Sequence, residues 1–308
     1  MYLGIDIGGT AVKYGLVADD GVVDGLAEYP VDFDGYETPI LDTVLKTSQE
    51  YLKGCKKRGI LISGIGISAT GQINSRDGVV AGTGGNIKNW DQSRIRDVFT
   101  DQFGLPCEVI NDANSVALGE MWTGAAKGYS DFAVITVGTG IGGGMVAGGR
   151  LLQGNLGFGG EIGHMIIGGD RRCTCGNRGC LEQYASVTAL IRRVSGRCPD
   201  LAGAEQGING RKIFELAGSG HPEVSAELVA WIDDLAVGIT SLIHLLNPAL
   251  ILIGGGVSTQ QELFIDPLRK KVKSMAMPNF SEHLRLRGAV LGNMAGLAGA
   301  VYYLKQQS

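Results

Sequence analysis

The sequence has no strong excess of either charge. Its 308 residues include 27 basic and 31 acidic side chains, which give a formal net charge of −4. Proteins that bind nucleic acid or an anionic membrane through their charge carry a basic excess on the contacting face. We therefore expect neither partner.

The sequence also lacks a recognisable segment for export or membrane insertion. The N-terminus has no basic stretch and no long apolar run, so no signal peptide is predicted. The most apolar region, from about Leu235 to Ile253, is interrupted by His244, Asn247 and Pro248, and we expect it not to span a membrane. The length suits two domains with a large core, and the expected compartment is the cytoplasm.

Cysteine is scarce, and its distribution is uneven. Three of the six cysteines, Cys55, Cys107 and Cys198, are scattered and are expected to be buried or free thiols. The other three share a span of 17 positions with one histidine: His164, Cys173, Cys175 and Cys180.

This cluster has the composition of a tetrahedral zinc site. Thiolates and a histidine nitrogen are zinc ligands, and Gly176 and Gly179 allow the backbone to turn tightly around one ion. Reduced cysteines or a loop disulfide would fit a cytosolic chain with this spacing less well. Four protein ligands leave no position for water, so we predict a structural zinc that fixes the loop carrying Glu161 and Glu182.

Glycine, in contrast, is abundant. The 50 glycines are about twice the usual share, and many gather in short turns between apolar runs. Strands are predicted from Tyr2 to Ile7 and from Ala11 to Val17, on either side of Gly8-Gly9-Thr10. Backbone N–H groups in such a turn can bind an anion, although an ordinary hairpin fits this segment equally well. The turn lacks the lysine and the following helix of a P-loop.

The same arrangement returns about 130 residues later. A predicted strand from Asp131 to Val137 enters Gly138-Thr139-Gly140, and a second strand runs to Ala147. The repetition predicts two related halves that face each other, with the phosphates of one nucleotide between the two turns. A third strand-to-glycine turn, Gly254-Gly255-Gly256, suits close contact with a base or a ribose.

Asp112 stands between a predicted strand, Cys107 to Ile110, and a predicted helix that runs through Met121. Ligands of α/β sheets bind at such strand ends. The segment alone leaves two roles open, a ligand-facing carboxylate or a helix N-cap, and one residue can serve in both.

Further helices are predicted over residues 42–57, 91–103 with Asp91 as the cap, 181–194, 222–246, 260–275 and 294–305. His244 stands among leucines and is expected in the core or as a capping residue, not as a ligand.

Together these segments resemble the ROK family of bacterial sugar kinases from end to end. The resemblance rests on six segments in the family's order: 6–10 (DIGGT), 111–114 (NDAN), 138–144 (GTGIGGG), 160–164 (GEIGH), 173–182 (CTCGNRGCLE) and 253–258 (IGGGVS). It implies an actin-like (ribonuclease H-like) fold of two α/β domains around a central cleft. Residues 1–115 plus about 290–308 would form the small domain, and 116–289 the large domain with the zinc site.

The resemblance also implies an activity. ATP with magnesium would be the phosphoryl donor and a hexose the acceptor, most simply glucose phosphorylated on its 6-hydroxyl. Asp112 would be the catalytic base that accepts the proton of the attacking hydroxyl. Homodimers are usual in the family, so a homodimer is expected.

Binding residues follow from the same resemblance. Sugar contacts are implied for Gly71, Asn86, Asn111, Asp112, Glu161, His164 and Glu182. His164 would bind zinc with one ring nitrogen and a sugar hydroxyl with the other. Nucleotide and magnesium contacts are implied for Asp6, Gly8, Gly9, Thr10, Lys13, Gly138, Thr139, Gly140, Gly254, Gly255 and Gly256.

Two loops near the acceptor depart from the family pattern. Thr70 and Asn74 stand where family members commonly have a proline and an aspartate, and Lys88 replaces a proline or a small residue. These departures leave the sugar open, and N-acetylmannosamine, N-acetylglucosamine, fructose or a β-glucoside are alternatives to glucose.

Two other classes of protein are less compatible with the sequence. ROK repressors carry a helix-turn-helix domain before the first strand, whereas here a strand is predicted from Tyr2 and the charge is near neutral. A non-catalytic sugar-binding protein would need neither Asp112 nor the two phosphate turns. We therefore expect an enzyme.

Overall fold

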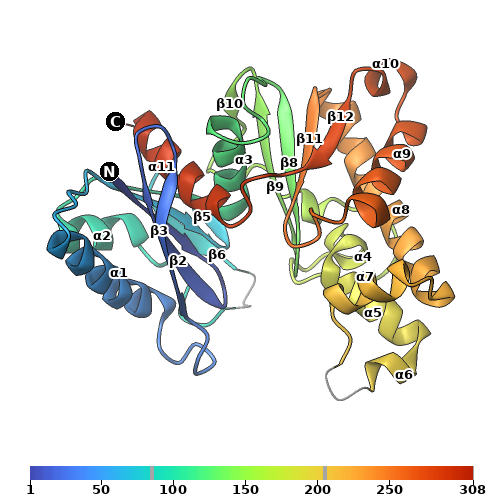
Figure 1. Cartoon of the computed structure of the whole chain (residues 1–308), viewed down its shortest axis with the longest axis horizontal. Helices are drawn as coiled ribbons and strands as arrows, with labels where there is room; N and C mark the ends of the chain where they lie inside the picture. The colour runs from blue at the N-terminus through green and yellow to red at the C-terminus, as the bar shows by residue number, and fades with distance from the viewer. Residues whose placement is uncertain (84–86, 204–206, 308) are drawn as a thin grey trace.

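Two five-stranded sheets form the framework of the protein (Figure 1). The computed structural model describes residues 1–83, 87–203 and 207–307. The first sheet has the order β3-β2-β1-β4-β7. Its strands are β1 (Tyr2–Ile7), β2 (Ala11–Val17), β3 (Val23–Pro30), β4 (Ile65–Ala69) and β7 (Cys107–Asn111).

The second sheet repeats this topology. Its order is β10-β9-β8-β11-β12, formed by β8 (Phe132–Val137), β9 (Ile141–Ala147), β10 (Arg150–Leu151), β11 (Leu250–Gly254) and β12 (Arg285–Gly288). In each sheet three antiparallel strands come first in the sequence, and two parallel strands then extend the sheet on its other side. The prediction that the two halves have related structures is confirmed by this shared strand order.

The helices cover the two sheets from both halves of the chain. They are α1 (Ile40–Lys57), α2 (Ile95–Phe103), α3 (Asp112–Trp122), α4 (Glu182–Ala185), α5 (Val187–Arg197), α6 (Pro199–Ala202), α7 (Gly210–Gly218), α8 (Pro222–Leu246), α9 (Asp266–Met275), α10 (Pro278–Ser281) and α11 (Met294–Gln307). A short hairpin of β5 (Gln72–Asn74) and β6 (Val79–Gly82) follows β4.

Two of these helices are exchanged between the halves. Helix α3 follows the first sheet in sequence but packs on β8 and β9, whereas α11 follows the second sheet and packs on β1 and β4. The two helices also pack on each other, and the end of α11 lies near the N-terminus (Figure 1). Helix α11, which is 14 residues long, therefore completes the half of the protein that is made first.

Small residues make this close packing possible. A Cβ on Gly66 of β4 would lie 2.5 Å from the backbone of Ala300, and one on Gly299 would lie 1.7 Å from the carbonyl oxygen of Ser115 on α3. Any side chain at these positions would push α11 away from its neighbours.

A buried carboxylate holds the segment that leads into α11. Glu120 on α3 is 0% exposed. One of its oxygens accepts hydrogen bonds from the backbone N–H groups of Val290 and Leu291, both at 2.9 Å, and the other accepts one from Ala125 at 2.7 Å. A buried carboxylate with three N–H donors is well satisfied, so it fixes the crossover between the halves.

Helix α8 lies in the core of the second half. It runs unbroken from Pro222 to Leu246 and ends at Asn247 in a left-handed conformation, so the predicted bounds are confirmed. By length and composition alone it is, among the described residues, the one helix that could cross a membrane, with 56% of its most apolar window buried inside the protein. Trp231 and Leu235, both fully buried, are part of the core cluster of this half, as expected of a core helix.

Several predicted elements need correction. Asp91 is not a cap, because α2 begins at Ile95 and the Asp91 carboxylate accepts a hydrogen bond from the Thr83 hydroxyl instead. His244 is exposed rather than in the core, and its ring accepts a hydrogen bond from the N–H of Met277.

The predicted helix over residues 181–194 is two helices, α4 and α5. The chain is extended at Ser186, and the carbonyl of Ser186 accepts a hydrogen bond from the indole of Trp231. The predicted helix over residues 260–275 starts as a π-helical segment, Gln261–Ile265, before α9.

Candidate active site

A cleft of about 660 Å³ is lined by both halves of the chain. Its lining comes from the segment after β4, the start of α3, the turn between β8 and β9, the loop 157–161 and the loop that carries the cysteine cluster. Eleven residues predicted from the sequence line it: Gly71, Asn111, Asp112, Gly138, Thr139, Gly140, Glu161, His164, Cys175, Glu182 and Gly255.

Asn111 and Asp112 form the start of α3. Asn111 is the N-cap, and its side-chain oxygen accepts hydrogen bonds from the N–H groups of Ala113 and Asn114. The amide nitrogen of Asn111 donates to the carbonyl of Gly71 at 3.0 Å, which ties two predicted sugar contacts together. The cap role is therefore filled by Asn111, and Asp112 is the first residue of the helix.

The environment of Asp112 favours its protonated form. Burial raises the pKa of this carboxyl from 3.8 to about 7, and the negative charges of Asp6 and Glu161 add to the rise. The N–H of Ala113, 2.7 Å from the carboxylate, acts in the opposite direction and is outweighed. A carboxylate with a pKa near neutrality can take up a proton from an attacking hydroxyl.

Asp6 lies at the end of β1 and influences Asp112 through its charge. The hydroxyl of Ser68 donates a hydrogen bond to Asp6 at 2.6 Å, and burial raises the pKa of Asp6. Because the charge of Asp6 raises the proton affinity of Asp112, a cation near these two carboxylates would be stabilised. The fold thus brings together Asp6 and Asp112, which lie more than a hundred residues apart in the sequence.

The second glycine turn is held by the segment that follows the cysteine cluster. The N–H of Ile141 donates a hydrogen bond to the Glu182 carboxylate at 3.0 Å. The N–H of Val187 donates to the carbonyl of Gly138 at 2.9 Å, and the Thr188 hydroxyl donates to the carbonyl of Thr139 at 2.8 Å. Val187 and Thr188 had no predicted role, since hydrogen bonds across about fifty residues leave no signal in sequence spacing.

The first glycine turn, Gly8-Gly9-Thr10, is not among the residues that line the cleft. It closes on itself through the N–H of Gly8 and the carbonyl of Ala11, 2.9 Å apart. The Tyr36 hydroxyl donates to the carbonyl of Gly9 at 2.9 Å, another contact that sequence spacing does not reveal. Lys13 on β2 also lies outside the lining and donates to the side chain of Asn293 at 3.1 Å.

The third glycine turn approaches the second sheet very closely. Gly255 has a φ of +87°, and a Cβ there would lie 2.2 Å from the carbonyl oxygen of Val137. Only glycine fits such a position without a shift of the backbone. Gly255 lines the cleft, whereas Gly254 and Gly256 do not.

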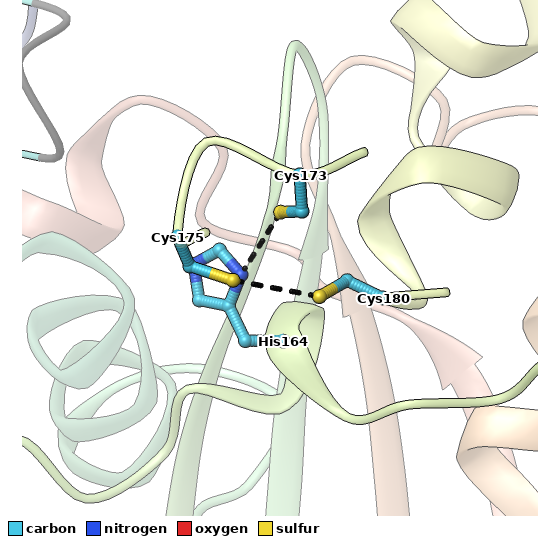
Figure 2. A group of neighbouring side chains, drawn as sticks. All are labelled: His164, Cys173, Cys175 and Cys180. Carbon is cyan, nitrogen blue, oxygen red and sulfur yellow. Dashed lines mark hydrogen bonds between the residues drawn. The ribbon is translucent and has the colours of Figure 1, made fainter. Parts of the chain in front are cut away.

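Four side chains of the cysteine cluster converge on one point (Figure 2). Their donor atoms, from His164, Cys173, Cys175 and Cys180, all lie within 4.8 Å of one another. Nδ1 of His164 is 3.5 Å from the Cys173 sulfur, and the sulfurs of Cys175 and Cys180 are also 3.5 Å apart. Tetrahedral ligands at about 2.3 Å from zinc are roughly 3.8 Å from each other, so the four donors fit one zinc ion.

His164 links this metal site to the cleft. Its Nδ1 faces the sulfurs, while its Nε2 lies 3.9 Å from a carboxylate oxygen of Glu161. Burial raises the pKa of Glu161, and the Glu182 charge adds to the rise, while His164 lowers it. His164 can therefore offer one ring nitrogen to a metal and the other to a ligand in the cleft.

The acceptor loops are only partly described. Asn86, a predicted sugar contact, lies outside the described residues. Lys88 forms an ion pair with Glu37 at 2.7 Å, and Trp90 is fully buried with its indole donating to the carbonyl of Thr70 at 3.0 Å. Thr70 and Lys88, which depart from the family pattern, therefore take part in contacts that shape the loops around the cleft.

One loop of the second half crosses to the first. A Cβ on Gly157, whose φ is +89°, would lie 2.8 Å from the carbonyl oxygen of Ile73 and from the hydroxyl of Ser75. Phe158, the next residue, lines the cleft although no sequence pattern singles it out.

Comparison with known proteins agrees with this architecture. The family described as "ROK family" matches residues 2–307. The chain belongs to the ROK family. It is 32% identical over 314 residues to a glucokinase from Thermotoga maritima, covering 99% of this chain and 97% of that protein.

Solved ROK structures share the fold. A ROK family glucokinase from Streptomyces griseus, in complex with glucose and AMPPNP, is 32% identical, with a TM-score of 0.86 over 99% of each chain. A putative N-acetylmannosamine kinase from Listeria monocytogenes, Lmo2764, is 29% identical, with a TM-score of 0.84 over 99% of each chain. The predicted actin-like α/β fold is confirmed, and the chain is related to sugar kinases.

Proposed function

We propose that this ROK protein is an ATP-dependent hexose kinase. The observation that carries the proposal is Asp112, a carboxyl at the base of the cleft whose pKa is raised to about 7. It lies at the start of a helix, beside Asn111, and the negative charges of Asp6 and Glu161 contribute to its raised pKa. Such a group suits a general base, and sugar kinases need one at this place.

In the proposed reaction Asp112 accepts the proton of a sugar hydroxyl. The hydroxyl oxygen then forms a bond to the γ-phosphorus of ATP, the bond from that phosphorus to the β,γ-bridging oxygen breaks, and ADP leaves. Because the transition state is loose, most of the catalysis would come from positioning and charge stabilisation.

The sugar would be held by acceptors and donors from both halves. Asn111 would fix the reacting hydroxyl beside Asp112. Glu161 and Glu182 would accept hydrogen bonds from vicinal hydroxyls, and His164 would donate one to a sugar oxygen from Nε2. Gly71 and Asn86 would contribute the remaining contacts. The support from geometry is that Gly71, Asn111, Glu161, His164 and Glu182 line one cleft.

The nucleotide would lie against the glycine turns. Gly138, Thr139 and Gly140 line the cleft and would contact the phosphates, with Gly8, Gly9, Thr10 and Lys13 approaching from the other half. The third turn, Gly254-Gly255-Gly256, would contact adenosine. Asp6 would hold magnesium through water, in keeping with its burial and with the effect of its charge on the pKa of Asp112.

The zinc site would have a structural role. His164, Cys173, Cys175 and Cys180 would hold the ion, which neutralises the thiolates and fixes the loop. With Nδ1 bound to zinc, the ring of His164 is held with Nε2 available for a sugar hydroxyl.

Glucose is the acceptor we propose, with phosphorylation of its 6-hydroxyl. The glucokinase relatives support it, and the putative N-acetylmannosamine kinase among the structural neighbours supports the main alternative. The Lys88–Glu37 ion pair and the substitutions at Thr70 and Asn74 distinguish the acceptor loops here from the usual family pattern.

A coupled assay of ADP release from Mg·ATP tests the proposal. The panel of acceptors contains glucose, mannose, fructose, N-acetylmannosamine, N-acetylglucosamine, allose and cellobiose. We expect glucose to give the highest kcat/KM. A higher kcat/KM for another sugar would make that sugar the acceptor. If folded, zinc-loaded protein released no ADP with any sugar of the panel, a sugar-binding regulator would be favoured, as in ROK repressors.

The cellular setting is part of the same proposal. We place the enzyme in the cytoplasm, where ATP is available, as a homodimer without nucleic-acid or membrane partners. Sedimentation at micromolar concentration would test the dimer directly.

A further inference from the structure

We call His164, Cys173, Cys175 and Cys180 the metal cluster. The segment after this cluster contacts the second glycine turn at three points. Only one residue separates Cys180, a predicted zinc ligand, from Glu182. We call residues 182–188 the clamp, because they hold the carbonyls of residues 138 and 139 and the N–H of residue 141. The three contacts measure 2.9, 2.8 and 3.0 Å.

Each contact uses a different kind of group. Val187 is the first residue of α5, so its N–H has no partner within the helix and is free to donate to Gly138. Thr188 contributes a side-chain hydroxyl to Thr139, and Glu182 contributes a carboxylate oxygen to the N–H of Ile141. The turn is therefore bound on both its donor and acceptor sides.

The clamp itself rests on the core. The carbonyl of Ser186 accepts a hydrogen bond from the Trp231 indole at 2.9 Å, and Trp231 is fully buried on α8. Just before the clamp, Leu181 is buried, with its side chain packed against Gly238 of α8. A turn fixed to such a support loses little freedom when it binds a ligand, which raises affinity.

Glu182 places the two binding functions on one side chain. One carboxylate oxygen accepts from Ile141, and a Cβ on Gly140 would lie 2.4 Å from that same oxygen. Glu182 also lines the cleft near Glu161, whose pKa its charge helps to raise. The same carboxylate thus lines the proposed sugar site and is bonded to the turn that is proposed to bind the phosphates.

We propose that the clamp holds the second glycine turn in its nucleotide-binding shape, with Thr188 as a positioning residue for ATP. The proposal rests on the proposed function of the turn as a phosphate site. It extends the role of the metal site, because the loop that carries Cys180 continues directly into the clamp. Occupancy of the metal site then sets the affinity for ATP as well as for sugar.

The test compares Thr188→Val with Thr188→Ser and Thr100→Val. Valine keeps the shape of threonine but cannot donate to Thr139, and serine restores the donor. Thr100 is exposed on α2 in the first half, so Thr100→Val controls for the same substitution on another helix. Zinc content, binding of a non-hydrolysable ATP analogue by calorimetry, and the KM values for ATP and sugar are measured for each protein.

We expect Thr188→Val to raise the Kd for the analogue and the KM for ATP about threefold to tenfold, the loss typical of one hydrogen bond. Sugar Kd, kcat and zinc content should stay within about twofold, Thr188→Ser should recover the wild-type Kd, and Thr100→Val should match wild type. Wild-type protein stripped of zinc should bind the analogue more weakly, and Thr188→Val should add little to that loss.

Two results would overturn the proposal. An unchanged analogue Kd in folded Thr188→Val protein would show that the clamp does not position the nucleotide turn. An equal rise in the Kd values for sugar and analogue would show general loosening instead. Neither result touches the kinase assignment, which depends on turnover by the wild-type enzyme, while binding of the analogue can be compared even if no sugar in the panel reacts.

Discussion

The two glycine turns occupy equivalent places in the two sheets, but they are supported differently. The turn at residues 8–10 lies between β1 and β2 and is contacted by Tyr36 from a surface loop. The turn at residues 138–140 lies between β8 and β9 and is bound by the segment that leaves the metal cluster. A repeated topology thus carries one glycine turn held by an aromatic side chain and another held by the segment that follows the metal cluster.

This difference separates the expected effects of substitutions. Changes in the metal cluster should disturb the second turn and the sugar contacts together, whereas changes at Tyr36 should affect the first turn alone. Asp112 belongs to neither turn, and its loss should stop phosphoryl transfer while both ligands still bind.

Replacement of Asp112 by asparagine should have the largest effect. Without the base, we expect kcat to fall about 10²- to 10⁴-fold, while calorimetry still detects sugar binding. Normal turnover would show that another group is the base.

The same variant has a consequence for stability. Because the pKa of Asp112 rises from 3.8 in the unfolded chain to about 7 in the fold, ionisation at pH 8 opposes folding. Asp112→Asn should therefore raise the midpoint of thermal unfolding at pH 8, with a gain of at most about 4 kcal/mol, and should gain less at pH 5. A lower midpoint at pH 8 would mean that the carboxylate stabilises the fold.

Disruption of the metal cluster should rank next. Cys175 is the exposed cysteine among the four proposed ligands, so Cys175→Ser can be made with little change in packing. We expect zinc to fall well below one per chain and the sugar Kd to rise about 10- to 100-fold, with a smaller rise in the Kd for ATP analogue.

Cys198→Ser is the matched control, since Cys198 lies outside the cluster at the end of α5. It should keep both the metal and the affinities. Full sugar affinity in zinc-free Cys175→Ser protein would remove the orienting role of the metal.

The pH dependence of turnover follows from the carboxyl at the start of α3. Turnover needs ionised Asp112, so with a pKa of about 7 the rate should rise with pH and level off above neutrality. Below the pKa, kcat/KM for the sugar should fall about tenfold per pH unit. A profile that stays flat down to pH 5 would contradict the raised pKa.

The smallest effect is expected at Tyr36. Tyr36→Phe removes one hydrogen bond to the carbonyl of Gly9, so the KM for ATP should rise a few-fold, with sugar Kd and zinc content unchanged. Tyr129→Phe is the control, since the Tyr129 hydroxyl accepts from Arg285 well away from the turn. A change in zinc content or sugar Kd in Tyr36→Phe would mean that the two supports are not separate.

Local patterns account for the parts of the structure that could be predicted. The metal cluster was visible because its four residues lie within 17 positions, so chain distance and spatial distance agree. Helix α8 was predicted with correct bounds, since Pro222 suits a helix start and Asn247 adopts the left-handed conformation that ends one.

Other features depend on contacts that no local pattern contains. Strand β3 carries no clear strand signal, because Gly25 and Pro30 interrupt a short run at the edge of the sheet. Tyr36 contacts Gly9 from 27 residues away, and Thr188 contacts Thr139 from 49 residues away. The break between α4 and α5 involves the Trp231 indole, which bonds to Ser186 from another helix.

The exchanged helix α11 has a consequence for synthesis of the protein. The face of the first sheet that it covers includes Gly4 and Gly66, where a Cβ would lie 2.9 Å and 2.5 Å from the backbone of α11. Until the 14 residues of α11 leave the ribosome, this part of the sheet has no cover from its own side chains. A nonsense codon just before α11 would therefore leave the half of the protein that was made first incomplete and open to proteases.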